Sequence, residues 1–384
     1  TVGADIGRPK APLVHQGEAF LPNPTQERNP LMRTIGRLIL TAVFVVLTLF
    51  LVAAAAYVPG FFDFYTGVCR NILTFLGNLT APFPFAVWEI LLVLILLLLL
   101  YTLVRTFTHK RGFLCWLSGV ALFLSVMVFL FVGLWGVNHY APSVSEHVGL
   151  TVTGYTKAQL TDATAYMAAQ AGALADQVPR TEAGDMATDF SAMAKSAASG
   201  YEALGKQYDF FQVDSLPRVK KLLVPDLFNY TGTTGIFVPF TGESCVNPDT
   251  YAASLPFTMC HELDHRLTIA AEDEANFAAF LASTAHEDVA FRYSGWYSAF
   301  VYCYNALYEA DQAAATEIWD TMSETLRADC RRANAHYEPY EGTVQDVAQQ
   351  VNDAYLKAFD EEAGVKSYGK VADLLIAWYL KNAA

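Results

Sequence analysis

The chain has 384 residues, of which 53% are hydrophobic, and its mean hydropathy is +0.26. This composition is too apolar for an ordinary soluble protein and indicates that part of the chain lies in lipid. Residues 1–140 carry 9 Lys and Arg against 5 Asp and Glu, whereas residues 141–384 carry 16 against 33. The acidic C-terminal part argues against a nucleic-acid partner, because phosphate binding needs clustered Lys and Arg.

The N-terminal third predicts a tail followed by a membrane domain. Residues 1–33 are polar, proline-rich and aperiodic, which favours a disordered tail. Residues 34–140 hold three apolar runs, at 38–58, 85–104 and 113–137. Each run falls within the roughly 17–25 residues that cross a bilayer, so three transmembrane helices are expected. Between the first two runs, apolar residues over 61–85 recur at helical spacing and predict an amphipathic helix on the membrane surface.

Basic residues near the apolar runs predict the orientation, because Lys and Arg are retained on the cytoplasmic side. The loop after the first run has only Arg70, whereas the other flanks carry Arg28, Arg33, Arg37, Arg105, Lys110 and Arg111. We therefore expect a multi-pass protein of a bacterial cell membrane with a cytoplasmic N-terminus. Residues 141–384 then form an extracytoplasmic domain, and the lipid bilayer is the first expected partner.

The C-terminal domain reads mainly as helices. A Thr156-x-x-Gln159 capping box opens the first of them. Helical patterns cover residues 156–178, 185–206, 256–266, 272–284, 288–308, 312–333, 343–359 and 370–380. The main strand candidate is 235–240, where Pro239 restricts the strand to the edge of a sheet. The expected fold is mainly α, with three transmembrane helices followed by a predominantly helical domain and a small edge-strand sheet.

One motif carries chemistry. Residues 261–265 read His-Glu-Leu-Asp-His, an H-E-x-x-H pattern. On a helix, His261 and His265 project from one face a turn apart and can bind one metal ion, while Glu262 lies beside them. Zinc suits such a site, because three protein ligands leave a position for a water whose pKa the metal lowers.

A third ligand is expected from the next predicted helix. Glu272 is the first candidate and Glu274 the alternative. Asn276 lies four residues after Glu272 and could orient a histidine ligand from an outer position; Asp264, inside the motif, could tune one. Only residues 266–271 separate the second histidine from Glu272, so the chain must turn sharply without a glycine.

These motifs resemble known families. The H-E-x-x-H followed by Glu-x-x-Ala-Asn resembles gluzincin metallopeptidases, including CAAX-processing and HtpX-like membrane proteases, and is similar to ImmA/IrrE-type metallopeptidases. A closer resemblance is to an uncharacterised bacterial membrane family, domain of unknown function thirty-eight-ten. Its members share three N-terminal spans, the segments 235–243 and 272–277, the H-E-x-x-H and the run 367–371.

The resemblance implies a zincin-like domain that holds Zn²⁺ on His261, His265 and Glu272, with Glu262 as general base for peptide hydrolysis. Zincins also bind extended substrate along an edge strand, a role that here falls to Gly235, Ile236, Phe237 and Val238; an ordinary edge strand covering the core is the alternative. A peptide or protein substrate is then the expected partner. Two other functions stay open, a non-catalytic zinc-binding membrane sensor and an envelope protein.

Three smaller questions also stay open. Candidates for stabilising an oxyanion are His286, Arg292, Tyr293, His336 and Tyr340. The aromatic segment 291–308 reads first as core packing, with a substrate groove as the alternative. The six cysteines form no C-x-x-C pair, so a thiolate zinc site is not indicated.

Overall fold

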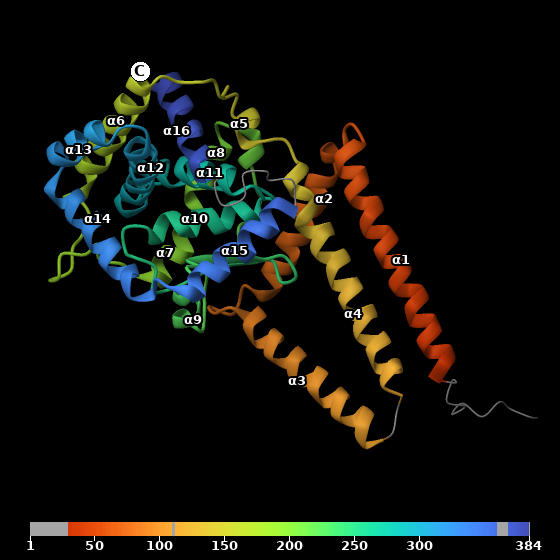
Figure 1. The fold of residues 1–384 in the computed structure, drawn as a ribbon. Coiled ribbons are helices and arrows are strands. Elements are labelled where there is room, and N and C mark those ends of the chain that lie inside the picture. Colours follow the sequence, from red (N-terminus) through yellow and green to blue (C-terminus); the bar gives the residue numbers. More distant parts are fainter. Residues whose placement is uncertain (1–29, 110–111, 359–367, 384) are drawn as a thin grey trace, which may run out of the picture.

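Three long apolar helices lead into a helical domain in the computed structural model, which describes residues 30–109, 112–358 and 368–383 (Figure 1). The long helices are α1 (Pro30–Tyr57), α3 (Val87–Thr108) and α4 (Phe113–Leu134). Each is long and apolar enough to cross a membrane, which confirms three candidate spans. Most of the expected N-terminal tail lies outside the described residues. Its end differs from the expectation, because residues 30–33 already belong to α1.

The helix expected between the first two spans is α2 (Phe61–Thr80). One face packs inward, where Cys69 and Leu73 are buried, and the other leaves Phe64 76% and Phe75 66% exposed. The buried face meets the C-terminal domain, a contact that the pattern at 61–85 did not predict. The exposed face keeps the apolar character on which the prediction of a surface helix rests.

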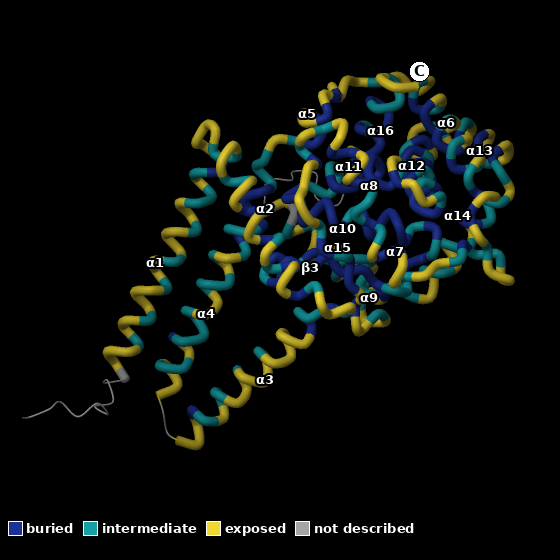
Figure 2. Tube along the Cα trace, turned by 180° about the vertical axis from the view of Figure 1, so that it is seen from behind, coloured by how far each residue is buried: buried dark blue, intermediate teal, exposed yellow. Residues whose placement is uncertain are grey.

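The C-terminal domain is built from short and medium helices around one core (Figures 1 and 2). In chain order they are η1 (Gly136–Tyr140), α5 (Val144–His147), α6 (Lys157–Ala175), α7 (Phe190–Ser196), α8 (Ser199–Gly205), η2 (Asp209–Phe211), α9 (Pro225–Tyr230), α10 (Leu255–Arg266), α11 (Glu272–Thr284), α12 (Val289–Ala310), α13 (Gln312–Thr321), α14 (Glu324–Tyr337), η3 (Glu338–Tyr340), α15 (Thr343–Ala358) and α16 (Tyr368–Asn382). The capping box at Thr156 is present and starts α6.

Two predicted helices are each split in the structure. The segment 185–206 holds α7 and α8: Asp189 accepts hydrogen bonds from the backbone of Ser191 and Ala192 and so starts α7 at Phe190, and a turn at Ala197 and Ala198 separates the two helices. The segment 312–333 breaks after Thr321, where Met322 is extended. Both breaks follow from local capping and backbone geometry, which helical periodicity does not reveal.

A three-stranded sheet lies beside α10. Its order is β1 (Lys220–Lys221), β3 (Glu243–Val246), β2 (Gly235–Val238), with β1 parallel and β2 antiparallel to β3. The strand expected at 235–240 is therefore an edge strand, as predicted, but ends at Val238 before Pro239. α2 packs against both this sheet and α10, and the end of α10 lies next to the C-terminal end of α4.

Candidate metal centre

The H-E-x-x-H segment lies on α10, which is buried along most of its length. Pro256 stands in its first turn, a position where proline costs no helical hydrogen bond. His261 and His265 project one turn apart, with their ring centroids 4.5 Å apart. The motif therefore has the local structure that its spacing predicts.

A tight turn returns the chain from α10 to the third candidate ligand. Thr268 has φ 71°, a left-handed conformation that is strained for a β-branched residue and replaces the missing glycine. The guanidinium of Arg70, from α2, donates to the carbonyl of Leu267 at 2.9 Å and to the Thr268 hydroxyl at 3.3 Å. The turn is thus held by a residue of the membrane-proximal helix.

Glu272 begins α11 and faces both histidines. Its Oε2 lies 3.3 Å from Nε2 of His261 and its Oε1 lies 3.6 Å from Nε2 of His265. The ligand atoms of these three residues all lie within 4.8 Å of one another. A tetrahedral zinc site with bonds of about 2.1 Å separates its ligand atoms by roughly 3.4 Å. The donor set and its spacing fit zinc.

The pKa values of His261, His265 and Glu272 are shifted by burial and by the interactions of these three groups with one another. Burial acts to lower the pKa of His261, but the hydrogen-bonded carboxylate of Glu272 outweighs this effect and raises the pKa to about 9. Burial and the neighbouring His261 lower the pKa of His265 to about 4. For Glu272, burial acts to raise the pKa, and the two histidines outweigh it and bring it to about 2. In the absence of metal, the site therefore holds an ion pair between His261 and Glu272.

Glu262 is buried beside this group. Burial raises its pKa to about 8, and its Oε2 has no hydrogen-bond partner among the described residues. Its other oxygen lies against Gly235, the first residue of β2: a Cβ added to that glycine would stand 2.3 Å from Oε1. The expected substrate strand thus begins in direct contact with the expected base, and only a glycine leaves room for both.

The residues expected to support the ligands act differently from the prediction. Nδ1 of His265 lies 2.8 Å from the carbonyl of Ile269, so the turn itself orients this histidine. Asn276 instead donates to the backbone oxygen of Glu272 at 2.8 Å and accepts from the Tyr302 hydroxyl at 2.9 Å. Asp264 is fully buried; burial raises its pKa well above its ordinary value, and neither oxygen has a hydrogen-bond partner among the described residues.

Glu274, the alternative ligand, points elsewhere. Its carboxylate accepts from the backbone of Ser145 at 3.1 Å and lies 3.3 Å from the Ser145 hydroxyl. Burial raises its pKa to about 7. Glu274 therefore ties α11 to the segment that follows the third span, and the histidines face Glu272.

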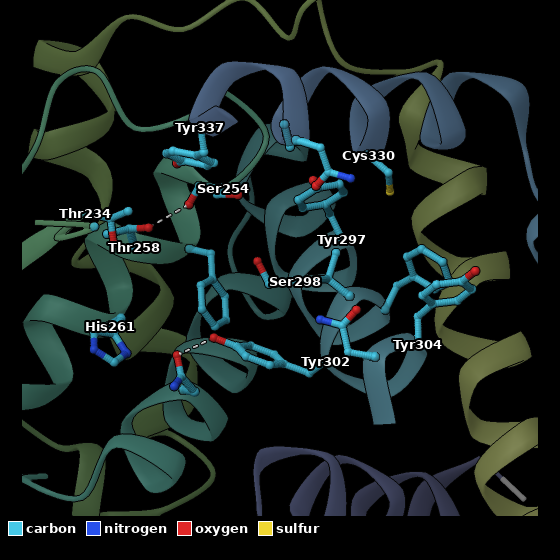
Figure 3. A pocket seen from close by; sticks show the side chains of 18 of the residues that line it. Thr234, Ser254, Thr258, His261, Tyr297, Ser298, Tyr302, Tyr304, Cys330 and Tyr337 are labelled. Atoms are coloured by element: carbon cyan, nitrogen blue, oxygen red, sulfur yellow. Dashed lines mark hydrogen bonds between the residues drawn. The ribbon is translucent and has the colours of Figure 1, made fainter. Parts of the chain in front are cut away.

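A cavity of about 560 Å³ opens next to the site (Figure 3). His261 and Glu272 are the only charged or ionisable side chains of the Asp, Glu, Lys, Arg and His types in its described wall. Aromatic rings and amides supply much of the rest, among them Phe257, Asn276, Tyr297, Tyr302, Tyr304, Asn305, Trp319, Asn334, Tyr337 and Tyr340. Within the segment 291–308, Tyr293 packs in the core, whereas Tyr302 and Tyr304 line the cavity; the substrate groove stays a prediction.

Most of the candidate oxyanion stabilisers are engaged elsewhere. His286 contacts Ser199 and the Ser196 carbonyl, Arg292 donates to the His286 carbonyl, Tyr293 bonds Asp329, and His336 bonds the Asp249 carbonyl. Of the five candidates, Tyr340 alone is in the described cavity wall. The six cysteines, which all lie in described segments, are free thiols.

One neighbour of the candidate metal centre was not expected from sequence. Trp135, the residue after α4, places its ring centroid 5.0 Å from that of His265 and 5.4 Å from that of Phe237 in β2. Its indole nitrogen donates to the Tyr355 hydroxyl of α15. A tryptophan at the end of an apolar run reads as an interfacial anchor, so no sequence signal pointed to this contact.

Comparison with known families agrees with the resemblance seen in the motifs. A family described as "Protein of unknown function (DUF3810)" matches residues 64–376, and the chain belongs to this family. No curated protein and no solved structure matches.

Proposed function

We propose that this member of the family is a membrane-anchored zinc metallopeptidase that hydrolyses peptide bonds. One observation carries the proposal: the distances of 3.3 Å and 3.6 Å from Glu272 to His261 and His265 are those of neighbouring ligands around one tetrahedral ion. The buried Glu262 beside them, with a carboxylate oxygen unpartnered among the described residues, supplies the base.

Each residue has a defined task in this proposal. His261, His265 and Glu272 hold the ion, and the Ile269 carbonyl fixes the ring of His265. A bound zinc ion would supply Lewis acidity, which would lower the pKa of water and polarise the substrate carbonyl. Burial makes Glu262 a stronger base than an exposed glutamate, and a cation bound beside it would keep it ionised, so that its carboxylate accepts the proton as the water oxygen bonds to the carbonyl carbon. When the C–N bond breaks, the same carboxyl returns this proton to the leaving amine.

Two surfaces are suited to hold the substrate. β2 is one of the two edge strands of the sheet, and an extended peptide can pair with such an edge whatever its sequence. The neighbouring cavity lies within the usual range of about 300–1,000 Å³ for ligand pockets. Because the described part of its wall is uncharged apart from His261 and Glu272, a charged substrate side chain would lose its hydration there without gaining a counter-ion. We therefore expect neutral or aromatic substrate residues in the cavity.

The proposed orientation places this domain outside the cytoplasm. Arg33, Arg37 and Arg105 line one cavity between α1, α3 and α4. This end of the spans, where α1 starts and α3 connects to α4, lies away from the C-terminal domain (Figure 1). Basic residues gathered at one end of three spans favour that end as cytoplasmic.

The test uses the full chain in lipid nanodiscs. Bound metal is counted by mass spectrometry of the eluted ions, and a peptide library is screened for cleavage. We expect one zinc per chain and cleavage that Glu262→Gln abolishes while zinc remains bound. Glu287→Gln is the matched control, because Glu287 is an exposed glutamate that does not line the cavity.

The other outcomes separate the alternatives. Stoichiometric zinc with no cleavage of any peptide would support the zinc-binding sensor and contradict the peptidase. Absence of stoichiometric metal would contradict both the peptidase and the zinc-binding sensor, and the envelope protein would be the remaining function. Cleavage that survives Glu262→Gln would show a contaminating protease or a different base.

A further inference from the structure

We propose that the substrate is itself anchored in the membrane and is cut about five residues outside its anchor. This inference rests on the proposed peptidase function and adds a substrate class to it. The starting observation is the contact between Trp135 and His265, with ring centroids 5.0 Å apart. α4 ends at Leu134 within the third candidate span, so a proposed ligand of the metal centre contacts the residue that follows this membrane helix.

The substrate strand runs from the centre toward this span. At its start, Gly235 contacts Glu262. Near its end, Phe237 packs on Trp135 at 5.4 Å, and just beyond it Phe240 packs on Phe131 of α4 at 6.2 Å. A peptide paired with β2 therefore has one end at the base and the other at the outer end of a membrane helix.

These contacts set the length of the connection. From Gly235 to Val238 an extended chain covers about 10 Å at 3.3 Å per residue. The polar headgroup layer adds roughly 6 Å on each side of the hydrocarbon core. The sum corresponds to about five residues between the scissile bond and the last membrane-embedded residue.

The centre cannot readily move away from the bilayer, because three sets of hydrogen bonds attach it to the membrane domain. Arg70 of α2 donates to the Leu267 carbonyl at 2.9 Å and to the Phe210 carbonyl at 2.7 Å. Arg266 donates to the Leu73 carbonyl of α2 at 3.2 Å. These bonds join α2 directly to the end of the metal-binding helix.

The third contact joins the sheet to the second span. Glu243 of β3 accepts from the backbone of Val87 and Trp88, the first residues of α3, at 2.9 Å each. Its carboxylate also pairs with Lys220 at 2.6 Å, and both side chains are buried. A buried ion pair that also caps a helix end resists displacement, since separating it leaves an uncompensated charge. The spacing between the metal centre and the membrane is therefore built into the fold.

The side of the metal centre that faces away from α4 can bind the rest of the substrate polypeptide. The cavity begins at Thr233 and Thr234, immediately before β2, and continues past His261 toward α12 and α14 (Figure 3). An anchored polypeptide can thus leave the membrane beside α4, follow β2 to Glu262 and continue into the cavity. A substrate without a membrane anchor that bound along the same path would have to place one of its ends at the lipid surface.

The test varies only the distance from an anchor. One peptide that the library screen shows to be cut is placed about 5, 15 or 30 residues after a common transmembrane helix. Each of these anchored substrates is reconstituted at equal density with the zinc-loaded full chain in vesicles. Because all three share the same confinement to two dimensions, a difference in rate reports spacing and not concentration.

We expect the shortest spacing to be cut at least about tenfold faster than the longest, with the cut about three to eight residues from the anchor. Equal rates at all three spacings, or cuts scattered along the longest spacer, would overturn the inference and leave the peptidase intact. The peptidase itself is tested by the unanchored peptide in nanodiscs with Glu262→Gln as control. Failure to cut any substrate with zinc bound would remove both proposals together.

Discussion

Replacing Gly235 with alanine should disable the centre without removing any ligand from it. The added Cβ would stand 2.3 Å from Oε1 of Glu262 and 2.7 Å from its Cδ and Cγ. Ordinary contacts begin near 3.4 Å, so strand and carboxyl must separate by roughly 1 Å. Neither group can move freely, because β2 is paired with β3 and Glu262 is part of the buried helix α10.

The magnitude follows from this displacement. Overfilling a packed site costs about 1–3 kcal/mol of unfolding free energy. A shift of about 1 Å in a catalytic group costs on the order of 100-fold in rate, equivalent to about 2.7 kcal/mol of activation free energy. Zinc occupancy should stay at the wild-type level, because Gly235 contacts Glu262 and not the ligand atoms. The variant thus separates loss of base geometry from loss of metal.

The assay combines thermal unfolding, metal analysis and kcat/KM on the cleaved peptide. Gly154→Ala is the matched control, because no atom lies within 4 Å of the Cβ it would add. A double-mutant cycle with Glu262→Ala should shrink the stability cost of Gly235→Ala, since the clashing carboxyl is gone. The reasoning is refuted if zinc-loaded Gly235→Ala keeps kcat/KM within about twofold of wild type.

Three further predictions concern the metal and the support of the site. Glu272→Gln should weaken zinc binding by more than about 100-fold in a chelator competition, whereas Glu274→Gln should leave it unchanged; equal losses would contradict the ligand assignment. Because the pKa of His261 is raised to about 9 without metal, its ring is protonated at pH 7, and zinc binding should release at least one proton. Calorimetry in buffers of different ionisation enthalpy measures the number of protons released, and zinc binding without proton release would disprove the ion pair between His261 and Glu272. Lys220→Met removes the cation of the buried pair and should cost about 3–5 kcal/mol in unfolding, against little for the exposed Lys221→Met; similar costs would show that the pair is unimportant.

The sequence by itself determined the elements whose signal is local. Three apolar runs of membrane-crossing length predict α1, α3 and α4, because hydrophobic length alone decides whether a helix can span lipid. The spacing of His261 and His265 puts both rings on one helical face, and Pro239 restricts the strand predicted at 235–240 to the edge of a sheet. These properties depend on residues a few positions apart in the sequence and can be predicted without knowledge of the fold.

Tertiary structure decided the choice between groups that look alike in sequence. Glu272 and Glu274 are both carboxylates at the start of α11, and only the packing of α5 against that helix directs Glu274 to Ser145. The strained Thr268 turn is stable because Arg70, almost two hundred residues earlier in the chain, bonds it. The contact between Trp135 and His265 likewise joins distant segments. Such contacts are set by how whole elements pack, and the free energy of that packing has no local pattern in the sequence.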